Sequence, residues 1–332
     1  FIITSKNIRK NNKIIKIDNS RDVDAIISSI KSNFDLIDEI ITMNEVFVII
    51  VDKLKEKLNI KKDIYFDPTL FRCKNQFKEL LLKNEVKTPE YIFFKNFREL
   101  EENANNFSYP VIIKPSAGFA SGLVRKIYDK NELLKQAKLI EKFNIALISD
   151  LSLKNLGIIL EEYIDGEEYS IDTIWNGGKP ICHFIMSRGY TSGPLFPDQL
   201  YIIDPYLDKK LKSKIIDTCV KAVKCSGLIY GATHIECKVD MECGDVYILE
   251  GACRPGGSGY VLNIFSIAYE YDVLKLYFLA LTNTHDFIIK YLKTLNASKE
   301  PKKFLFEYFI PFNGSGQIQK VIKPNKYNLG KN

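Results

Sequence analysis

The chain has 332 residues, 46% apolar and 27% charged, which is typical of a globular protein with room for two or three domains. Its net charge of +6 comes from 47 basic against 41 acidic residues, and no basic block carries interleaved aromatics, which argues against nucleic acid as a partner. No apolar run reaches the roughly 18 residues of a membrane span. The seven cysteines are scattered and lack CxxC spacing, so we expect a reducing, cytoplasmic location rather than a disulfide framework.

The first 70 residues are predicted to form small α/β units. Short apolar runs at 13–17 and 39–43 favour buried strands, and 23–31 and 45–58 have the periodicity of amphipathic helices. The chain begins FIITSKN without an initiator Met, and we expect it to enter midway through a first strand or just after one. A domain boundary is expected within 62–74.

A strand, a small-residue loop and a second strand follow a predicted helix over 74–83 and a strand over 91–94. The strand at 110–115 contains Lys114, the loop is SAGFASG at 116–122, and 123–127 resumes as a strand. A P-loop would instead show GxxxxGK[ST] leading into a helix, so that motif is excluded. The backbone N–H groups of such a loop can bind phosphate. The alternative is an ordinary glycine loop of a hairpin.

The middle of the chain is predicted to be a sheet with one long helix. Strands are expected at 155–163, from 166 through 174, and at 180–186, and the helix at 205–225 carries lysines that we assign to a solvated face. Arg188, before a Gly/Pro loop, is a candidate for binding a substrate carboxylate bidentately. The alternative is a plain surface arginine.

Residues 231–257, GATHIECKVDMECGDVYILEGACRPGG, are predicted to form a β-hairpin. With the turn centred near Cys243, Glu236 and Glu250 lie across from each other, about 4.5–5.5 Å apart between Cβ atoms, where like charges are destabilising. A divalent cation with a phosphate-bearing ligand would explain that pair, and the alternative is a surface hairpin with splayed, solvated acids. Arg254 then enters the 255–257 turn, where a fixed guanidinium could face an anion.

Two neighbours of Glu236 on the same strand face leave their roles open. His234 either touches substrate or is a satisfied sheet residue, and Lys238 contacts either a phosphate or a cross-strand acid. Helices are expected over 259–283. After them a strand-like run at 304–312 opens a subdomain that the sequence does not finish.

Four segments taken in order resemble the ATP-grasp superfamily, and within it the carboxylate–amine ligases related to L-amino-acid ligases. The segments are Lys74 leading to Lys87-Thr88-Pro89, PVIIKPSAGFASG at 110–122, LEEYIDGEEYSID at 160–172, and HIE with YILEGACRPGG within 234–257. Each motif is weak by itself, and the specificity comes from all four occurring in this order over roughly 38–320.

The resemblance implies an α/β (α+β) fold, with a Rossmann-like N-terminal domain and two α+β lobes holding ATP between them. It implies an N-terminal domain over 1–70, a small lobe with a glycine-rich lid over 71–160, a large lobe with the metal and substrate site over 161–283, and a C-terminal subdomain from 284 to 332. Two lysines would hold the phosphates, the lid would cover them, a hinge would bind adenine largely through its backbone, and an acid would bind the ribose. The lysines are Lys74 and Lys114, and the lid residues are Ser121 and Gly122. The hinge consists of Glu161, Glu162, Tyr163 and Ile164, and the acid is Glu168.

The same resemblance implies that Glu236 and Glu250 ligate Mg²⁺ (or Mn²⁺) and that Arg254 is the catalytic residue that steadies the acyl phosphate and the tetrahedral intermediate. Gly256 and Gly257 would line the pocket of the acyl substrate. Many relatives carry Glu-x-Asn-x-Arg where this chain has Glu250-Gly251-Ala252-Cys253-Arg254, and alanine cannot ligate a metal. The number of metal ions is therefore left open.

The expected reaction is ATP-dependent activation of a carboxylate, of an amino acid or small peptide, as an acyl phosphate that an amine then attacks. Such phosphoryl transfer depends on positioning and charge neutralisation, which agrees with a chain that has no GxSxG motif. Two alternatives remain: a bicarbonate- or formate-using enzyme of the purine or biotin-carboxylase type, and a non-catalytic ATP-binding regulatory module. The expected partners are small molecules, and a homodimer is an assembly that the resemblance allows.

Overall fold

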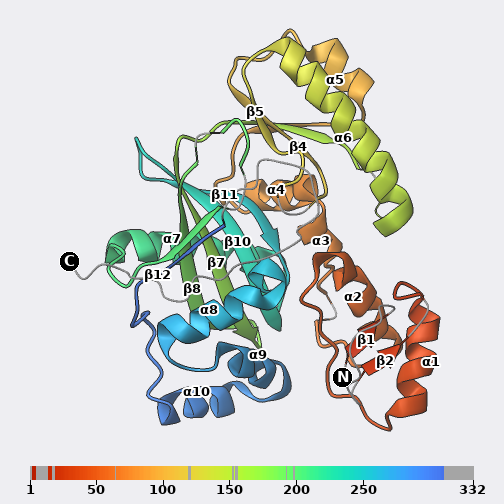
Figure 1. Ribbon diagram of the computed structural model, residues 1–332, viewed down its shortest axis with the longest axis vertical. Helices are drawn as coiled ribbons and strands as arrows, with labels where there is room; N and C mark the ends of the chain where they lie inside the picture. The colour runs from red at the N-terminus through yellow and green to blue at the C-terminus, as the bar shows by residue number, and fades with distance from the viewer. Residues whose placement is uncertain are drawn as a thin grey trace, which may run out of the picture.

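The computed structural model describes residues 2–4, 14–16 and 19–309, apart from 64, 119, 120, 152, 154, 155, 192, 197 and 198, and for 2–4, 14–16 and 146–151 it describes the backbone alone. Its strands form three sheets with helices packed against them (Figure 1). None of the helices in these ranges combines the length and the apolar character that a membrane crossing needs. The last part of the expected strand at 304–312, and the run after it, lie outside the described residues.

The N-terminal segment packs as a separate small unit at the lower right of Figure 1. Ile26 and Ile30 of one helix pack against Leu54 of another, as the predicted apolar periodicity requires. The strand expected at 39–43 is wrong, because this stretch has no strand beside it and instead packs Ile41 and Met43 against helices of the large lobe. The elements of this segment are β1 (Ile2–Thr4), β2 (Ile14–Lys16), α1 (Val23–Asn33), η1 (Glu45–Phe47) and α2 (Val48–Lys57).

A four-stranded antiparallel sheet in the order β3-β6-β4-β5 forms the small lobe. Its core packs the sheet against α5 and α6, two helices that the sequence analysis did not name. The helix expected at 74–83 and the strand expected at 91–94 are confirmed. The elements here are α3 (Thr69–Arg72), α4 (Lys74–Lys83), β3 (Tyr91–Phe94), α5 (Phe97–Asn103), β4 (Val111–Pro115), β5 (Arg125–Ile127), α6 (Lys130–Leu151) and β6 (Ile158–Glu162).

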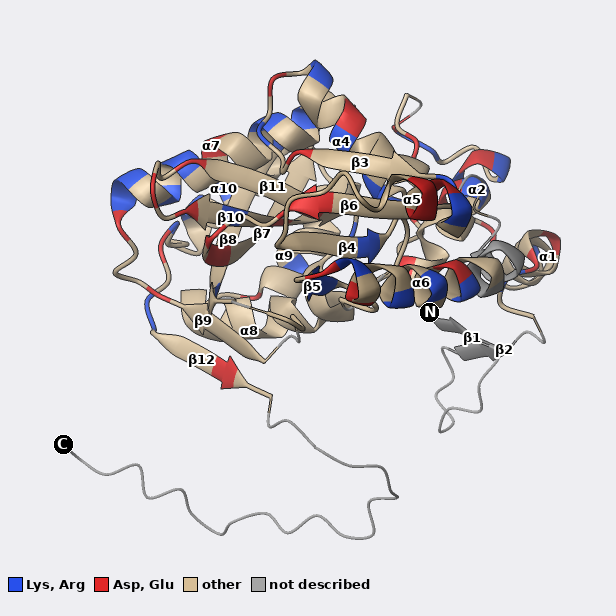
Figure 2. Ribbon diagram, turned by 90° about the horizontal axis from the view of Figure 1, so that it is seen from above, with Lys and Arg blue, Asp and Glu red and all other residues tan. Residues whose placement is uncertain are grey.

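The large lobe holds a six-stranded antiparallel sheet in the order β11-β10-β7-β8-β9-β12. Helix α7 begins at Lys209, later than expected, because Asp208 accepts the Leu211 N–H and caps it. Exposed lysines lie along α7, as Figure 2 shows in blue. The elements are β7 (Gly166–Asn176), β8 (Lys179–Tyr190), β9 (Leu200–Ile203), α7 (Lys209–Cys225), β10 (Gly231–Asp240), β11 (Val246–Ala252), η2 (Gly256–Gly259), α8 (Tyr260–Tyr269), α9 (Val273–Thr282), α10 (His285–Thr294) and β12 (Leu305–Tyr308).

Alternation along β10 separates a core face from a face that carries polar groups. Ile235 and Cys237 are buried in the core beneath α7, as predicted. Ala232, on the opposite face, packs with α8, α9 and α10. Farther along that second face come His234, Glu236 and Lys238, so the sheet places these three side chains in a row beyond the end of the helical cover.

Candidate functional site

Two adjoining cavities lie on the polar face of the large sheet. We call the one between the small and large lobes the interlobe cavity, and the one that reaches the N-terminal segment the junction cavity. They share Lys74, Gly118, Ser121, Glu236 and Glu250, so one continuous space runs between them. The interlobe cavity is also lined by Ile112, Lys114, Pro115, Gly122, Val124, Glu161, Glu162, Tyr163, Ile164, Glu168, Phe196, Lys238 and Leu249. The junction cavity is also lined by Asn44, Glu45, Phe71, Tyr201, His234, Gly251, Ala252, Arg254, Gly257, Ser258 and Val261.

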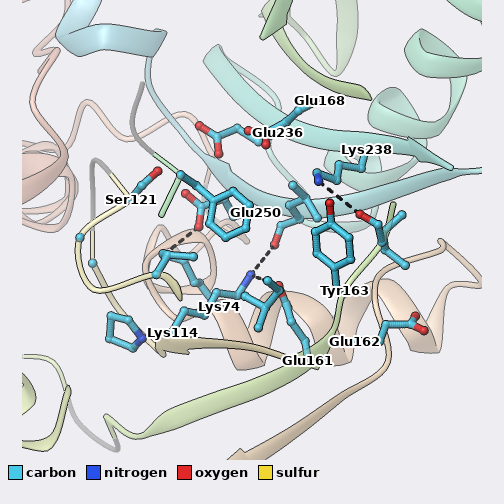
Figure 3. Close-up of a pocket in the computed structure, with 18 residues that line it drawn as sticks. Lys74, Lys114, Ser121, Glu161, Glu162, Tyr163, Glu168, Glu236, Lys238 and Glu250 are labelled. Atoms are coloured by element: carbon cyan, nitrogen blue, oxygen red, sulfur yellow. Dashed lines mark hydrogen bonds and ion pairs between the residues drawn. The ribbon is translucent and has the colours of Figure 1, made fainter. Parts of the chain in front are cut away.

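Both lysines predicted to hold phosphate point into the interlobe cavity (Figure 3). Lys74 begins α4, and its Nζ lies 3.0 Å from Oε2 of Glu250. Lys114, near the end of β4, has its Nζ 2.7 Å from Oε1 of Glu161. Both side chains are almost fully buried, so their charges meet little solvent and act strongly on any anion placed in the cavity.

Glu161 supports the lysines, and its side chain does not serve as an exposed part of the hinge. Its carboxylate is buried between Lys114 and Lys78, whose Nζ is 2.9 Å from the second carboxylate oxygen. Burial favours a neutral acid, but Lys114 and then Lys78 outweigh it and lower the pKa of Glu161. Burial lowers the pKa of Lys78 to about 8, although Glu161 acts in the opposite direction. Lys78 also donates to Thr88 Oγ1, which donates to the carbonyl of Ile248 and so connects the network to the large lobe.

The remaining hinge residues divide into structural and cavity-facing groups. The Glu162 N–H donates to the Glu90 carbonyl, and its carboxylate accepts the Glu90 N–H, so these groups hold the start of β3. In Figure 3 Glu162 accordingly lies at the margin of the labelled residues. Tyr163 lines the cavity with its ring 3.3 Å from Lys126 Nζ and 4.8 Å from Lys238 Nζ. Lys238 donates to the carbonyl of Ile164, which explains why this lysine is buried yet satisfied.

Arg188 is not a surface arginine. It is buried on β8, with Nη1 2.6 Å from Glu168 and 3.3 Å from Glu236. Burial would raise the pKa of Glu236, but Arg188 and then His234 outweigh it and lower that pKa. The alternative of a plain surface arginine is wrong, because Arg188 is buried and pairs with two acids of the cavity wall, and substrate binding by Arg188 stays a prediction. The pairing arises because β8 adjoins β7, which brings Glu168 alongside.

The register of the hairpin places the two expected metal ligands opposite each other. Glu236 of β10 pairs directly with Glu250 of β11, as the sequence predicted. Both carboxylates are partly exposed to the shared part of the two cavities. Cations offset their repulsion: Lys74 contacts Glu250, and Arg188 and His234 contact Glu236. Two opposed carboxylates with oxygen donors suit a hard divalent cation.

The described residues include no group of three or more His, Cys, Asp or Glu side chains able to hold a metal by themselves. That fits Mg²⁺, which usually takes one or two carboxylates and completes its shell with water and substrate phosphates. Ala252 lines the junction cavity and offers no ligand, as expected from its side chain.

His234 is fixed by Asp172, a residue that the sequence analysis did not single out. Its Nδ1 lies 2.7 Å from Asp172 Oδ2, and its Nε2 lies 3.3 Å from Glu236 Oε1. Burial alone would lower the pKa of His234, but Asp172 and Glu236 raise it to about 10, so the ring is an imidazolium at neutral pH. The other oxygen of Asp172 accepts the N–H of Gly256. A Cβ at Gly256 would lie 2.6 Å from His234 Nδ1, so this close approach requires glycine.

Arg254 lies in the junction cavity, beside a carboxylate that the sequence analysis also missed. Its Nε is 2.5 Å from Glu45 Oε2, and Arg72 Nη1 is 2.8 Å from the other oxygen of Glu45. Of the residues that the sequence-based prediction missed, Lys78 could have been recognised as part of the site, because it follows Lys74 by four residues on the same helix face. Glu45 carried no comparable signal, because no local pattern connects it to a residue 209 positions away.

Gly257 lines the junction cavity. The lid residue Gly122 lines the interlobe cavity, and the lid residue Ser121 lines both cavities. Ser121 has a φ of 51° and Gly257 a φ of 49°, so both turns use left-handed backbone. Gly256 lies behind the cavity wall, against His234. The middle of the lid, Phe119 and Ala120, lies outside the described residues.

Comparisons with known proteins agree with this geometry. A family model for the ATP-grasp domain matches residues 107–261. D-alanine–D-alanine ligase A of Bacillus cereus is 24% identical over 191 residues, which cover 55% of this chain and 57% of that enzyme. The chain therefore spans little more than half the length of this curated relative.

Among solved structures, the L-amino acid ligase from Bacillus licheniformis superposes with a TM-score of 0.77 and 25% identity, covering 91% of this chain and 71% of that chain. The biotin carboxylase domain of the Hydrogenobacter thermophilus 2-oxoglutarate carboxylase superposes with a TM-score of 0.60 and 19% identity, covering 81% and 60%. That structure is a dimer in complex with MgADP, ADP and bicarbonate, and at this identity it supports the fold alone. The two sheets, the four motifs in order and these matches show that residues 107–261 carry an ATP-grasp domain.

Proposed function

We propose that this protein is an ATP-dependent ligase, which activates a carboxylate of an amino acid or small peptide as an acyl phosphate and joins it to an amine. One observation carries the proposal: the opposed pair Glu236 and Glu250 lies where the interlobe and junction cavities meet. Buried lysines line one side of this pair and Arg254 the other. A phosphoryl group placed there would lie between a nucleotide site and an acyl site.

In this proposal ATP occupies the interlobe cavity. Lys74 and Lys114 would hold its phosphates beneath the lid at Ser121 and Gly122, with Tyr163 and Ile164 beside the adenine and Glu168 near the ribose. Glu161 would contribute indirectly by holding Lys114, and Glu162 would contribute indirectly by holding the start of β3. The lysines are already held in place by Glu250 and Glu161, and fixed charges of this kind give strong electrostatic stabilisation.

Glu236 and Glu250 would hold Mg²⁺ or Mn²⁺, which when bound neutralises phosphate charge during transfer. The chain's own groups do the rest. A carboxylate oxygen of the acid substrate attacks the γ-phosphorus and ADP leaves, with Lys74 and Lys114 facing the charge that moves. The amine then attacks the acyl carbon, loses a proton, and expels phosphate. Arg254, at the junction cavity, would face the oxyanion of that second step.

Two alternatives share this nucleotide site. A bicarbonate- or formate-using reaction is supported by the biotin-carboxylase neighbour at the level of fold. A non-catalytic ATP-binding module is favoured only by Ala252, which lacks the metal-ligating side chain of many relatives. The junction cavity favours the ligase over both, because bicarbonate and formate need little room beside the phosphate, whereas this cavity extends from Glu250 to Val261 and Asn44.

ADP release with Mg-ATP against a panel of amino acids, singly and in pairs, tests the proposal. Bicarbonate and formate belong in the same panel. We expect release that requires an acid and an amine together, with a dipeptide or amide as the product by mass spectrometry. Release driven by bicarbonate or formate would replace the ligase with the alternative enzyme. ATP binding without release from any combination would favour the regulatory module.

The predictions about substrates and assembly are part of the same proposal. We expect small-molecule substrates, and a homodimer would be tested by light scattering of the full-length protein. All seven cysteines are free in the structure.

A further inference from the structure

Glu45 is the residue through which the N-terminal segment enters the site. It begins η1, directly after Asn44, and lines the junction cavity together with Arg254. Its side chain is only 9% exposed, although carboxylates are rarely buried unless paired. Both of its oxygens are engaged, one with Arg254 and one with Arg72. A single carboxylate thus connects three segments that are distant in the sequence.

Stability alone is a poor explanation for this arrangement. Two guanidinium groups share one carboxylate, so the buried cluster keeps a net charge of +1. Removing such charges from water is costly, and apolar packing of the same volume often stabilises a fold as well. A buried cluster of this kind, at the wall of a substrate cavity, instead indicates that the position of a charged group matters.

The group whose position is constrained is the guanidinium of Arg254. Its Nε lies 2.5 Å from Glu45 Oε2 in an ion pair without a hydrogen bond between these two atoms, and its Nη1 donates to the carbonyl of Pro255 at 2.8 Å. Arg254 lines the junction cavity, and within the described part of the chain its Nη2 has no partner, so this nitrogen can meet a substrate oxygen. Arg72 Nη1 also lies 3.4 Å from the carbonyl of Gly118, at the start of the lid, which places the Glu45 contact beside the phosphate loop.

We propose that Glu45 is a positioning residue, contributed by the N-terminal segment, which holds the guanidinium of Arg254 so that Nη2 faces the junction cavity. This inference rests on the ligase function proposed above. It makes the N-terminal segment a component of the acyl site. Without Glu45, Arg254 would keep its charge but lose the contact that fixes its direction, and a misplacement of about 1 Å can reduce a rate about a hundredfold.

The matched control is Glu39, six residues earlier in the same segment. Its side chain is as deeply buried as that of Glu45, and it pairs with Lys55 at 2.6 Å, but it lines a different cavity, which reaches Cys253 and not Arg254. Glu39→Gln therefore removes a buried charge from the same segment without touching the site. Any effect shared by Glu39→Gln and Glu45→Gln reports general packing, and an effect of Glu45→Gln alone reports the contact with Arg254.

Two measurements on the full-length protein test the proposal. The first is kcat for ADP release, and KM for ATP, with the acid and amine that the panel identifies. The second is hydrogen exchange of the peptide over 252–261, which needs no substrate. For Glu45→Gln we expect kcat to fall by about 10- to 100-fold, KM for ATP to stay within about twofold, and exchange of this peptide to become faster. Glu39→Gln should match wild type in both measurements.

Wild-type kcat in Glu45→Gln would overturn the proposal, as would wild-type exchange at 252–261 or equal losses in the Glu39→Gln control. If Glu45→Gln does not fold, Glu45→Asp keeps the charge at shorter reach, and its kcat should lie between that of wild type and that of Arg254→Lys. If wild type releases no ADP with any acid, the ligase function fails, and the exchange comparison alone decides whether Glu45 holds Arg254.

Discussion

The two cavities differ in how they are built. The interlobe cavity draws its charged groups from motifs that are each continuous in the sequence, and its lysines are supported by acids within the two lobes. The junction cavity is completed by Glu45, which belongs to the N-terminal segment, and by Asp172, which holds His234 and Gly256 from the neighbouring strand. The proposed nucleotide site can therefore be recognised segment by segment, whereas the proposed acyl site exists only once separate parts of the chain have packed.

The largest expected effect falls on the boundary between the cavities. Glu250→Gln keeps the shape of the side chain but removes the charge opposite Glu236, so we expect turnover to fall by roughly a thousandfold. Adenine binding should remain measurable, because Tyr163 and Ile164 lie elsewhere in the interlobe cavity. ADP release and binding of a fluorescent nucleotide measure the two effects. Full turnover in this variant would remove the metal assignment.

The second prediction concerns the role of Arg254 in the junction cavity. Arg254→Lys keeps a positive charge but loses the Nε that faces Glu45, so the charge is no longer held in direction. We expect kcat to fall by roughly a hundredfold while the Kd for ATP stays unchanged. Steady-state kinetics and nucleotide titration separate the two. A higher Kd for ATP with normal kcat would place Arg254 in the nucleotide site and contradict the separate roles of the two cavities.

The third effect is a pH dependence confined to the interlobe cavity. Lys78 has a pKa of about 8, below its usual 10.5, so it loses its charge in the folded protein first as pH rises. Between these values the unfolded chain binds more protons, so the contribution of Lys78 to folding stability rises with pH. ATP affinity should change in the opposite direction and fall by up to about tenfold above pH 8. Once Lys78 is neutral, Lys114 is the remaining cation beside Glu161, so the negative charge of Glu161 offsets the positive charge that Lys114 would present to phosphate.

Nucleotide titration across pH 7 to 10 measures this change in affinity. Lys78→Arg is the matched variant, since arginine keeps its charge over the whole range. Its ATP affinity should lose the fall above pH 8. An equal fall in wild type and variant would assign the pH dependence to another group.

The smallest effect concerns the missing metal ligand. Ala252 lines the junction cavity, so the longer side chain of Ala252→Asn would extend into it and add an amide oxygen near Glu250. We expect the Mg²⁺ concentration for half-maximal ADP release to fall about two- to fivefold, since an added oxygen ligand strengthens a site of few protein ligands. A magnesium titration of both proteins tests this. An unchanged requirement would mean that substrate oxygens already fill that position.

Local sequence patterns determined the parts of the site that depend on neighbouring residues. Strand alternation and the length of the hairpin placed Glu236 opposite Glu250, and helix periodicity placed Lys74 at the start of α4. The order of the four motifs gave the resemblance to ATP-grasp proteins, and a family model matches an ATP-grasp domain at residues 107–261. These features follow from hydrogen bonds and side-chain periods that repeat over two to four residues, so they can be recognised without knowing the tertiary structure.

Tertiary structure alone decided which charges meet. Arg188 is buried beside Glu168 and Glu236, Glu161 supports Lys114 from within the core, and the stretch at 39–43 packs as irregular chain. Above all, Glu45 reaches Arg254 across 209 residues. Coulomb attraction acts through space and grows as water is excluded, so the partner of a buried charge depends on which surfaces the fold brings together, and sequence separation carries no record of it.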